Sequence, residues 1–297
     1  MKILITGGTG FVGSHLRKEL LRKGHQLRLL VHRQTDGLED GVEQVKGDIT
    51  RMETLGGAAE GCQALINLVG IIREFPSKGT TFQRLHVTAT ANALAMAREA
   101  GIDRYLQMSA LGTRPDAVSE YHKTKFKAEE LVRASGLSWT ILRPSLIFGP
   151  KDAFVNMLAE NLRLAPVMPV MGDGKYRLQP IHADDVARCF TLCLELPATV
   201  RQSYELCGND RFTYQELLDR IAAAMGRPAP FKPQLPLGLM KLVIPVMQHL
   251  PPFPITMDQL QMLLEENICD GNWKQTFNFE PISFEAGIRE YLGACHS

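Results

Sequence analysis

The chain has 297 residues, 45% of them hydrophobic and 22% charged, and its 33 lysines and arginines against 32 aspartates and glutamates leave a net charge of +1. These values are typical of a folded chain of about two domains, and they exclude a disordered chain, a coiled coil and a collagen-like repeat. Because no basic field is present, nucleic acid is not an expected partner.

The predicted elements of the first half alternate between short β-rich runs and helical patterns. The predicted strands are Lys2–Thr6, Gln26–Val31, Val42–Lys46, Ala64–Leu68, Arg104–Met108 and Trp139–Leu142. The predicted helices are Phe11–Lys23, Leu55–Glu60, Gln83–Glu99 and Tyr121–Ser135. Strands that are apolar almost throughout are typical of a parallel sheet covered on both faces, so the sequence predicts an α/β, doubly wound Rossmann sheet.

After about Pro150 the regular alternation of predicted strands and helices ends. A helix near Asp184–Leu196 and a strand at Ser203–Cys207 are expected to complete the sheet, within residues 178–208. Thr213–Glu216 and Thr256–Gln259 read as capping boxes that open helices. We therefore expect a Rossmann domain over residues 1–150 and a smaller, mainly helical lobe over 151–297, built largely from Lys151–Arg177 and from Asn209 onward.

Neither a leader nor a membrane span is predicted. The opening residues MKILIT run straight into a glycine-rich turn without a small-residue cleavage site. The most apolar stretch, Leu235–Leu250, is broken by prolines and a lysine and falls short of the roughly 18 uninterrupted residues that a span needs. We expect it to be a lid or a core element, with a membrane-surface or quinone-proximal role as the alternative.

The cysteines show no pattern of a metal site or a disulfide framework. None forms a C-x-x-C pair or clusters with histidine; they are Cys62, Cys189, Cys193, Cys207, Cys269 and Cys295. Neither a metal nor a disulfide framework is therefore expected, and a reducing cytoplasm is the expected location. Cys189 and Cys193, four apart on a predicted helix, are expected to be buried core thiols.

A glycine-rich turn directly after the first strand is the strongest functional signal. Gly7, Gly10 and Gly13 have the spacing G-x-x-G-x-x-G and open the first predicted helix. Such glycines permit a tight turn, a close approach to a pyrophosphate and close packing of helix on strand, while the helix N-terminus attracts the phosphates. The turn predicts a dinucleotide site, whose contacts at this loop are Gly7, Thr9, Gly10, Phe11, Val12 and Gly13.

The end of the second strand decides which dinucleotide is expected. An NAD site has a carboxylate there, whereas this chain has His32 and Arg33. An arginine suits a 2′-phosphate, so NADP(H) is predicted in preference to NAD(H). Further along the sheet, Asp48 is placed to accept from the adenine amino group, beside Ile49. The residues expected to line the adenine and ribose are Leu68, Val69 and Gly70.

A tyrosine and a lysine four residues apart, Tyr121 and Lys125, share one face at the start of a predicted helix. An ammonium beside a phenol favours the phenolate, so the pair predicts proton transfer by Tyr121 with Lys125 as its electrostatic partner. Ser109, just after the fifth strand, is expected to hydrogen-bond a substrate carbonyl. The Tyr-x-x-x-Lys spacing also arises by chance, and Ser109 upstream makes it specific.

Together these residues resemble the short-chain dehydrogenase/reductase superfamily, through Thr6–Gly13, Ser109 and Tyr121–Lys125. Its extended branch is resembled at Arg143–Ser145, Phe148–Gly149 and Pro180–Ala187. Over nearly the whole chain there is a likeness to an atypical subgroup that includes the nucleotide-binding accessory subunit of mitochondrial complex I. The stretches that carry it are His86–Val87, Met108–Gly112, Lys151–Phe154 and Pro254–Leu260.

The resemblance implies a bound dinucleotide, with the nicotinamide near Tyr121, Lys125 and the run Pro144, Ser145 and Leu146. It also shows one departure. Extended members usually carry an asparagine that supports the proton relay where this chain has His86. The relative in complex I is regarded as a subunit that holds its cofactor without turnover.

One histidine–carboxylate group has two interpretations. His182 with Asp184 and Asp185 suggests a metal site or a dyad, but such residues more often cap the following helix and anchor it to the sheet.

Three functions are therefore open. The first is an NADP(H)-binding oxidoreductase that transfers hydride to or from a small carbonyl, hydroxyl or quinone-type substrate. The second is a non-catalytic NAD(P)H-holding module of a respiratory, complex I-like system, peripheral to the inner face of a membrane. The third is a sugar-nucleotide epimerase or dehydratase, for which the sequence shows no recognisable diphosphate clamp in the second lobe.

Overall fold

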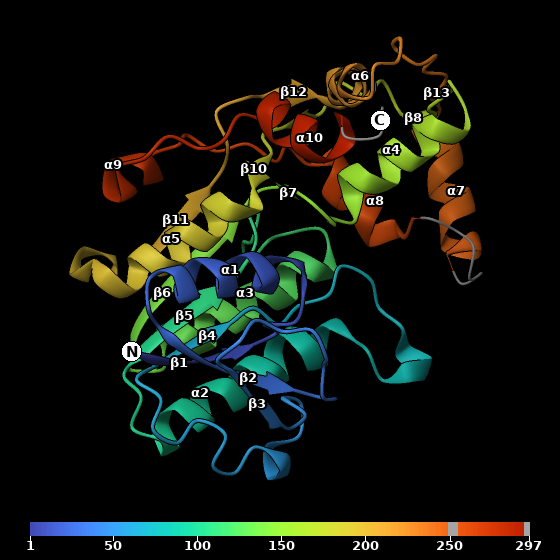
Figure 1. The fold of residues 1–297 in the computed structure, drawn as a ribbon. Coiled ribbons are helices and arrows are strands. Elements are labelled where there is room, and N and C mark those ends of the chain that lie inside the picture. Colours follow the sequence, from blue (N-terminus) through green and yellow to red (C-terminus); the bar gives the residue numbers. More distant parts are fainter. Residues whose placement is uncertain (249–254, 294–297) are drawn as a thin grey trace. The chain divides into compact units, whose positions relative to one another are not determined.

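The computed structural model describes residues 1–248 and 255–293, which fall into two compact units (Figure 1). Unit 1 comprises Met1–Pro144, Asp184–Leu206 and Asn272–Asn278. Unit 2 comprises Ser145–Ala183, Cys207–Gly271 and Phe279–Ser297. Cys295, Pro254 and the last two residues of Leu235–Leu250 lie outside the described residues.

Seven parallel strands form the sheet of unit 1 (Figure 1). They are β1 (Lys2–Thr6), β2 (Gln26–Val31), β3 (Val42–Lys46), β4 (Ala64–Asn67), β5 (Arg104–Met108), β6 (Ser138–Pro144) and β11 (Gln202–Leu206). Their order is β11-β6-β5-β4-β1-β2-β3. The order reverses between β1 and β4, the point at which doubly wound sheets bind ligands beyond the carboxyl ends of their strands. The predicted fold class is confirmed.

Helices cover the sheet of unit 1, with α1 (Phe11–Arg22) and α2 (Ala89–Glu99) on opposite faces (Figure 1). α3 (Glu120–Arg133) packs beside α2. α5 (Ala183–Glu195) joins α1 through an ion pair of 3.3 Å between Lys23 Nζ and Glu195 Oε1. Ile3, Leu4 and Ile5 of β1 are fully buried, because the strand is central and covered on both faces.

Two predicted helices of unit 1 differ in the structure. The prediction at Leu55–Glu60 is wrong, because the chain forms the 3₁₀ turn η1 (Met52–Thr54) and then turns through Gly57, whose φ of +73° breaks a helix. The prediction at Gln83–Glu99 divides into the π-helical segment η3 (Gln83–Thr88) and α2. The remaining short elements of unit 1 are η2 (Pro76–Lys78), η4 (Pro197–Thr199) and α9 (Trp273–Phe277).

Unit 2 is mainly helical, with short paired strands at its edges. Its helices are α4 (Phe154–Leu164), α6 (Tyr214–Ala224), α7 (Leu237–Met247), α8 (Met257–Leu264) and α10 (Phe284–Leu292). The strand pairs are β7 (Ile147–Phe148) with β10 (Ile181–His182), β9 (Arg177–Leu178) with β12 (Phe212–Thr213), and β8 (Val170–Met171) with β13 (Gln234–Leu235). Thr213 and Thr256 open α6 and α8 through the predicted capping boxes.

The apolar segment of unit 2 corrects the expectation of a core element. Its residues form α7, yet Leu239, Leu242 and Val246 are 53%, 75% and 72% exposed, and only Ile244 is buried. The prediction of a core element rested on hydrophobicity alone. A helix of 11 residues with a proline near one end buries only a narrow stripe of its surface, here Ile244. Within the described residues, no helix combines the length and apolarity needed to cross a bilayer.

Candidate nucleotide and proton-transfer site

Gly7 and Gly13 of the turn after β1 are required sterically. Gly7 has a φ of +72°, and a β-carbon there would lie 3.0 Å from the backbone of Leu68 and Val69. A β-carbon at Gly13 would overlap the carbonyl of Gly8, so α1 lies tightly on its own loop. Gly10 is exposed, and a β-carbon there would meet only the Gly7 carbonyl, at 3.3 Å. Its free side is the one that a ligand can approach closely.

The start of α1 fits a diphosphate. Its N-cap, Gly10, offers no side-chain cap to the first N–H groups, and the first turn carries no acidic residue. Those N–H groups and the helix dipole are suited to an anion. Thr9 is exposed beside them, Phe11 is half-buried, and Val12 belongs to the core.

Arg17, which the sequence interpretation missed, stabilises this loop. Its guanidinium donates to the carbonyl of Gly8 and, through Nε, to Glu39 Oε2 at 2.7 Å. Burial alone would raise the pKa of Glu39, but the hydrogen bond and charge of Arg17 lower it below its ordinary value. Position 17 lies four residues after Gly13 on the same helix face, and this spacing is the signal that could have identified it.

The residues expected to choose the nucleotide lie just beyond β2. His32 and Arg33 are both exposed, and the Arg33 guanidinium has no hydrogen bond or ion pair among the described residues. An unpaired guanidinium at this strand end is available to a phosphate.

Asp48, beyond β3, has one oxygen engaged and one available. Its Oδ1 accepts from Thr50 N at 2.9 Å and from Thr50 Oγ1 at 2.8 Å, while Oδ2 accepts nothing from the described residues. Burial opposes ionisation, yet these hydrogen bonds lower the pKa of Asp48, so it stays an acceptor. Ile49 beside it is buried in the core of unit 1.

A buried polar cluster holds the end of β4. Asn67 accepts from Thr6 Oγ1 at 2.7 Å and donates to Gln107 Oε1 at 3.0 Å, and its Oδ1 also accepts from Val69 N at 3.2 Å. The cluster fixes the segment Leu68–Gly70, of which Leu68 is buried and Gly70 exposed. Asn67 and Gln107 were also missed. The signal was an amide side chain at or near the carboxyl end of each of two largely apolar strands.

The side chain of Lys125, on α3, contacts the segment Leu68–Gly70. Its side chain is 2% exposed, and Nζ donates to Met108 O at 3.3 Å. A β-carbon at Gly70 would be 2.8 Å from the same Nζ, so the ammonium lies against the Gly70 backbone. Burial lowers the pKa of Lys125 to about 8, while Glu129 acts in the opposite direction. An ammonium has three donors, and only one is used within the described residues, which fits a ribose diol as the missing acceptor.

Tyr121 is also buried, and burial raises the pKa of its phenol to about 12. The phenol is therefore protonated at neutral pH. Ser109 is 4% exposed, and its hydroxyl is 3.4 Å from Thr113 Oγ1. Because Ser109 follows Met108, the structure places it next to the carbonyl that holds Lys125.

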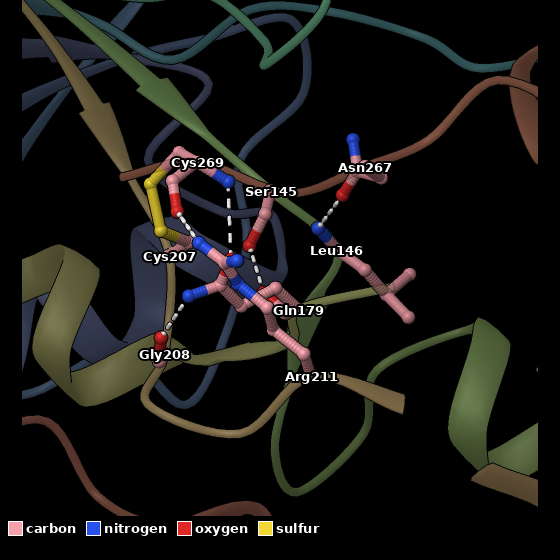
Figure 2. Close-up of a disulfide and its surroundings, with 8 residues drawn as sticks. All are labelled: Ser145, Leu146, Gln179, Cys207, Gly208, Arg211, Asn267 and Cys269. Carbon is pink, nitrogen blue, oxygen red and sulfur yellow. Dashed lines mark hydrogen bonds between the residues drawn. A yellow bond between two sulfur atoms is a disulfide. The ribbon is translucent and has the colours of Figure 1, made fainter. Parts of the chain in front are cut away.

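The predicted run Pro144–Leu146 is divided between the two units. Pro144 ends β6 in unit 1, where its carbonyl accepts from Leu111 N at 2.9 Å. Ser145 and Leu146 belong to unit 2, where Ser145 Oγ donates to Gln179 O at 2.6 Å and Leu146 N donates to Asn267 Oδ1 at 2.8 Å (Figure 2).

A disulfide beside these residues corrects the cysteine prediction. Cys207 and Cys269 are joined, with Cα atoms 6.1 Å apart and a sequence separation of 62 (Figure 2). Gln179 Oε1 accepts from Cys269 N at 3.0 Å, and Arg211 donates to Cys269 O at 2.7 Å. No disulfide framework was expected, and this one bond escaped the sequence patterns because only the folding of unit 2 brings these distant residues together. Cys62, Cys189 and Cys193 are free and buried, as predicted for the last two.

His182 ends β10, and Asp184 and Asp185 follow directly in α5. Within the described residues, no group of three or more histidine, cysteine, aspartate or glutamate side chains could hold a metal ion. Asp184 and Asp185 lie in the first turn of α5, the helix end that favours carboxylates.

Known proteins are similar to this chain in sequence and in fold. Residues 3–207 match the NAD dependent epimerase/dehydratase family. The chain is 32% identical over 229 residues to a ceramide reductase of Caulobacter vibrioides, covering 75% of this chain and 70% of that protein. It is 27% identical over 329 residues to a 2-alkyl-3-oxoalkanoate reductase of Stenotrophomonas maltophilia, covering 97% and 98%.

A mitochondrial relative is also similar. The NADH dehydrogenase [ubiquinone] 1 alpha subcomplex subunit 9 of Dictyostelium discoideum is 28% identical over 225 residues, 73% of this chain and 62% of the relative. The match thus spans about three fifths of that subunit.

Solved structures agree on the fold. The UDP-glucose 4-epimerase of Thermotoga maritima has a TM-score of 0.79 at 18% identity, covering 99% of this chain and 98% of that one. The extent of the family match, the glycine turn on a doubly wound sheet and the Tyr121–Lys125 pair lead to one assignment: the chain belongs to the NAD-dependent epimerase/dehydratase family, the extended branch of the short-chain dehydrogenases/reductases.

Proposed function

We propose that this protein is an NADP(H)-dependent oxidoreductase that reduces a carbonyl group or oxidises the corresponding hydroxyl. The observation that carries the proposal is the Lys125 ammonium, buried against Gly70 with one hydrogen bond to protein and four residues after Tyr121. Burying a cation with one partner is unfavourable unless a ligand supplies the others. The ceramide and 2-alkyl-3-oxoalkanoate reductases among the relatives support reduction of a carbonyl.

Three side chains take part in proton transfer to the carbonyl oxygen. When bound, the dinucleotide supplies or accepts a hydride. Tyr121, whose phenol is protonated at neutral pH, donates its proton to the carbonyl oxygen as negative charge develops there. Lys125 holds the nicotinamide ribose and stabilises the phenolate that remains. Ser109 Oγ donates a second hydrogen bond to the same oxygen and orients it.

The adenosine end is proposed to select NADP(H). Arg33 binds the 2′-phosphate together with His32, and Asp48 Oδ2 accepts from the adenine amino group. The diphosphate is held by the N-terminal N–H groups of α1 and the exposed side of Gly10. The family is NAD-dependent in its description, so this choice rests on the unpaired guanidinium.

The test combines cofactor identification with turnover. One sample of purified protein is denatured, and the nucleotide that it releases is identified. A native sample is then assayed with NADPH and a panel of ketones, aldehydes and quinones. We expect NADPH oxidation with at least one compound, and a Tyr121→Phe variant that binds NADPH normally with kcat reduced about a thousandfold. An active Tyr121→Phe variant would contradict the assigned mechanism.

A second function is favoured by the complex I relatives. The Arabidopsis thaliana subunit 9 matches over 90% of this chain and 71% of its own length, at 28% identity. A dinucleotide-holding module, peripheral to a membrane complex, would retain NADP(H) that no compound in the panel oxidises. This outcome, with the nucleotide bound, would replace the oxidoreductase proposal.

Sugar-nucleotide epimerase or dehydratase chemistry ranks third. The solved epimerases and dehydratases are at most 20% identical among those compared, for example a dTDP-glucose 4,6-dehydratase of Streptomyces venezuelae with a TM-score of 0.77, covering 99% of this chain and 96% of that one. That likeness supports the fold alone. Conversion of UDP-glucose by the purified protein would establish this chemistry.

A further inference from the structure

His86 lies at the centre of the packing between the segment after β4 and α3. It belongs to η3, a π-helical segment, and is 1% exposed. π-helical turns are rare and are frequently found at functional sites. Nothing in the proton-transfer scheme above uses this side chain.

Both ring nitrogens of His86 have partners. Nε2 is 3.1 Å from Ile71 O and 3.3 Å from Ile71 N, and Nδ1 is 2.9 Å from Thr124 Oγ1. A main-chain N–H and C=O on one side and a hydroxyl on the other satisfy the neutral ring in either tautomer. His86 therefore joins the residue after Gly70 to the residue before Lys125.

The ring also contacts the phenol directly. His86 stacks on Phe82 at 5.2 Å between centroids and meets the Tyr121 ring edge-to-face at 5.2 Å. Phe82 contacts the same tyrosine at 5.8 Å. These contacts leave the Tyr121 ring little freedom to rotate, because edge-to-face pairs have a defined geometry.

Burial keeps the His86 ring in its neutral form. The pKa of His86 falls to about 2, first because the ring is buried and second because the Lys125 ammonium repels a second cation. The imidazole is consequently neutral at every physiological pH, and the cation beside Tyr121 remains that of Lys125.

We propose that His86 is a positioning residue that ties Ile71 to Thr124 and thereby sets Tyr121 and Lys125 in the geometry required for cofactor binding and proton transfer. The inference rests on the proposed function. A hydrocarbon side chain would fill the same space, but it would hold neither Ile71 nor α3, and small misplacements of reacting groups are costly.

Three variants separate hydrogen bonding from packing. His86→Leu fills the space without hydrogen bonds, His86→Asn places a polar group near the position of Nδ1, and His86→Gln places one near that of Nε2. We expect NADPH affinity, read from its fluorescence, to fall about tenfold in His86→Leu and by about threefold or less in the two amide variants.

The turnover of the best panel carbonyl gives a second readout. His86→Leu is expected to lower kcat at least tenfold with little change in KM for the carbonyl, because alignment matters most in the transition state. A Thr124→Val change should reproduce part of this loss. The double variant should lose less than the sum of the two, as expected of residues that act through each other.

Thr191→Val is the matched control for loss of a buried threonine hydroxyl. Thr191 is fully buried on α5, and its Oγ1 donates to Ala187 O at 3.0 Å. It should lose stability comparable to Thr124→Val while NADPH affinity and kcat stay at wild-type values.

The outcomes distinguish the two proposals. Wild-type protein that binds NADPH without turnover overturns the oxidoreductase proposal, and NADPH affinity alone then decides the role of His86. Wild-type behaviour of His86→Leu, or losses in Asn and Gln variants equal to that of Leu, would show that the ring only fills space. Wild-type protein that does not bind NADPH would overturn both.

Discussion

At the scale of single residues, the proton-transfer pair illustrates how burial can override a neighbouring charge. Lys125 and Tyr121 both shift toward their neutral forms, with the pKa of Lys125 lowered to about 8 and that of Tyr121 raised to about 12. Desolvation disfavours any charged form, whatever its sign. Lys125 is therefore the group whose titration falls near the physiological range.

This shift predicts the pH dependence of both activity and stability. kcat/KM should fall as the pH rises through about 8, because the free protein then loses the ammonium that holds the ribose. The free energy of unfolding should change in the opposite direction. The unfolded lysine titrates near 10.5, so between about 8 and 10.5 the unfolded chain binds more protons, and the Lys125 contribution to stability rises with pH.

The measurement is a kcat/KM profile from pH 6 to pH 10 with NADPH, together with urea unfolding at the same pH values. Lys125→Met should be slow and should lack the decline above pH 8. A flat profile for the unaltered protein would contradict the assigned role.

The nucleotide preference is also decided by a single residue. Arg33→Ala should weaken NADPH binding about tenfold or more and leave NADH binding unchanged, since only the 2′-phosphate loses a charge-assisted partner. Fluorescence titration with each nucleotide measures this. Arg22→Ala, at the far end of α1, is the control and should change neither affinity. Equal losses for NADPH and NADH would place Arg33 elsewhere than at the 2′-phosphate.

At the scale of elements, the segment before α9 depends on the disulfide and on Gln179. Reduction or Cys269→Ser should lower the free energy of unfolding by about 2–4 kcal/mol, because the crosslink closes a long loop. Amides in residues 265–271 should exchange faster with solvent. Cys207→Ser should have the same effect, and the double variant should add nothing further.

Alkylation of the denatured chain checks the pairing. Two more cysteines should react after reduction than before it, one for each half of the bond. Equal labelling with and without reductant would show that the thiols are free.

The exposed face of α7 gives a second prediction for an element. Leu242→Gln and Val246→Gln should change the free energy of unfolding by less than about 0.5 kcal/mol, because both side chains are largely exposed. Ile244→Ala should cost about 2–4 kcal/mol, since Ile244 is fully buried. Urea unfolding at low protein concentration measures the difference. Destabilisation by Leu242→Gln would mean that this face is covered in solution.

At the scale of the whole molecule, the two units differ in how well sequence patterns predict them. In unit 1 the predicted bounds of β1, β2, β3 and β5 agree with the structure. The central strand β1 was predictable because a buried parallel strand is a nearly continuous apolar run. The prediction failed at Leu55–Glu60, where Gly57 turns the chain. In unit 2 only the capping boxes were predicted in detail, since its two-residue strands have no periodic pattern.

The sequence by itself determined the doubly wound sheet, the glycine turn after β1 and the Tyr121–Lys125 pair, because each leaves a recognisable local pattern in the chain. Tertiary structure alone decided the Arg17 contact with Gly8, the Cys207–Cys269 bond and the burial that sets the pKa values of Tyr121 and Lys125. Those features depend on which distant segments exclude water from one another, and a local pattern carries no record of that.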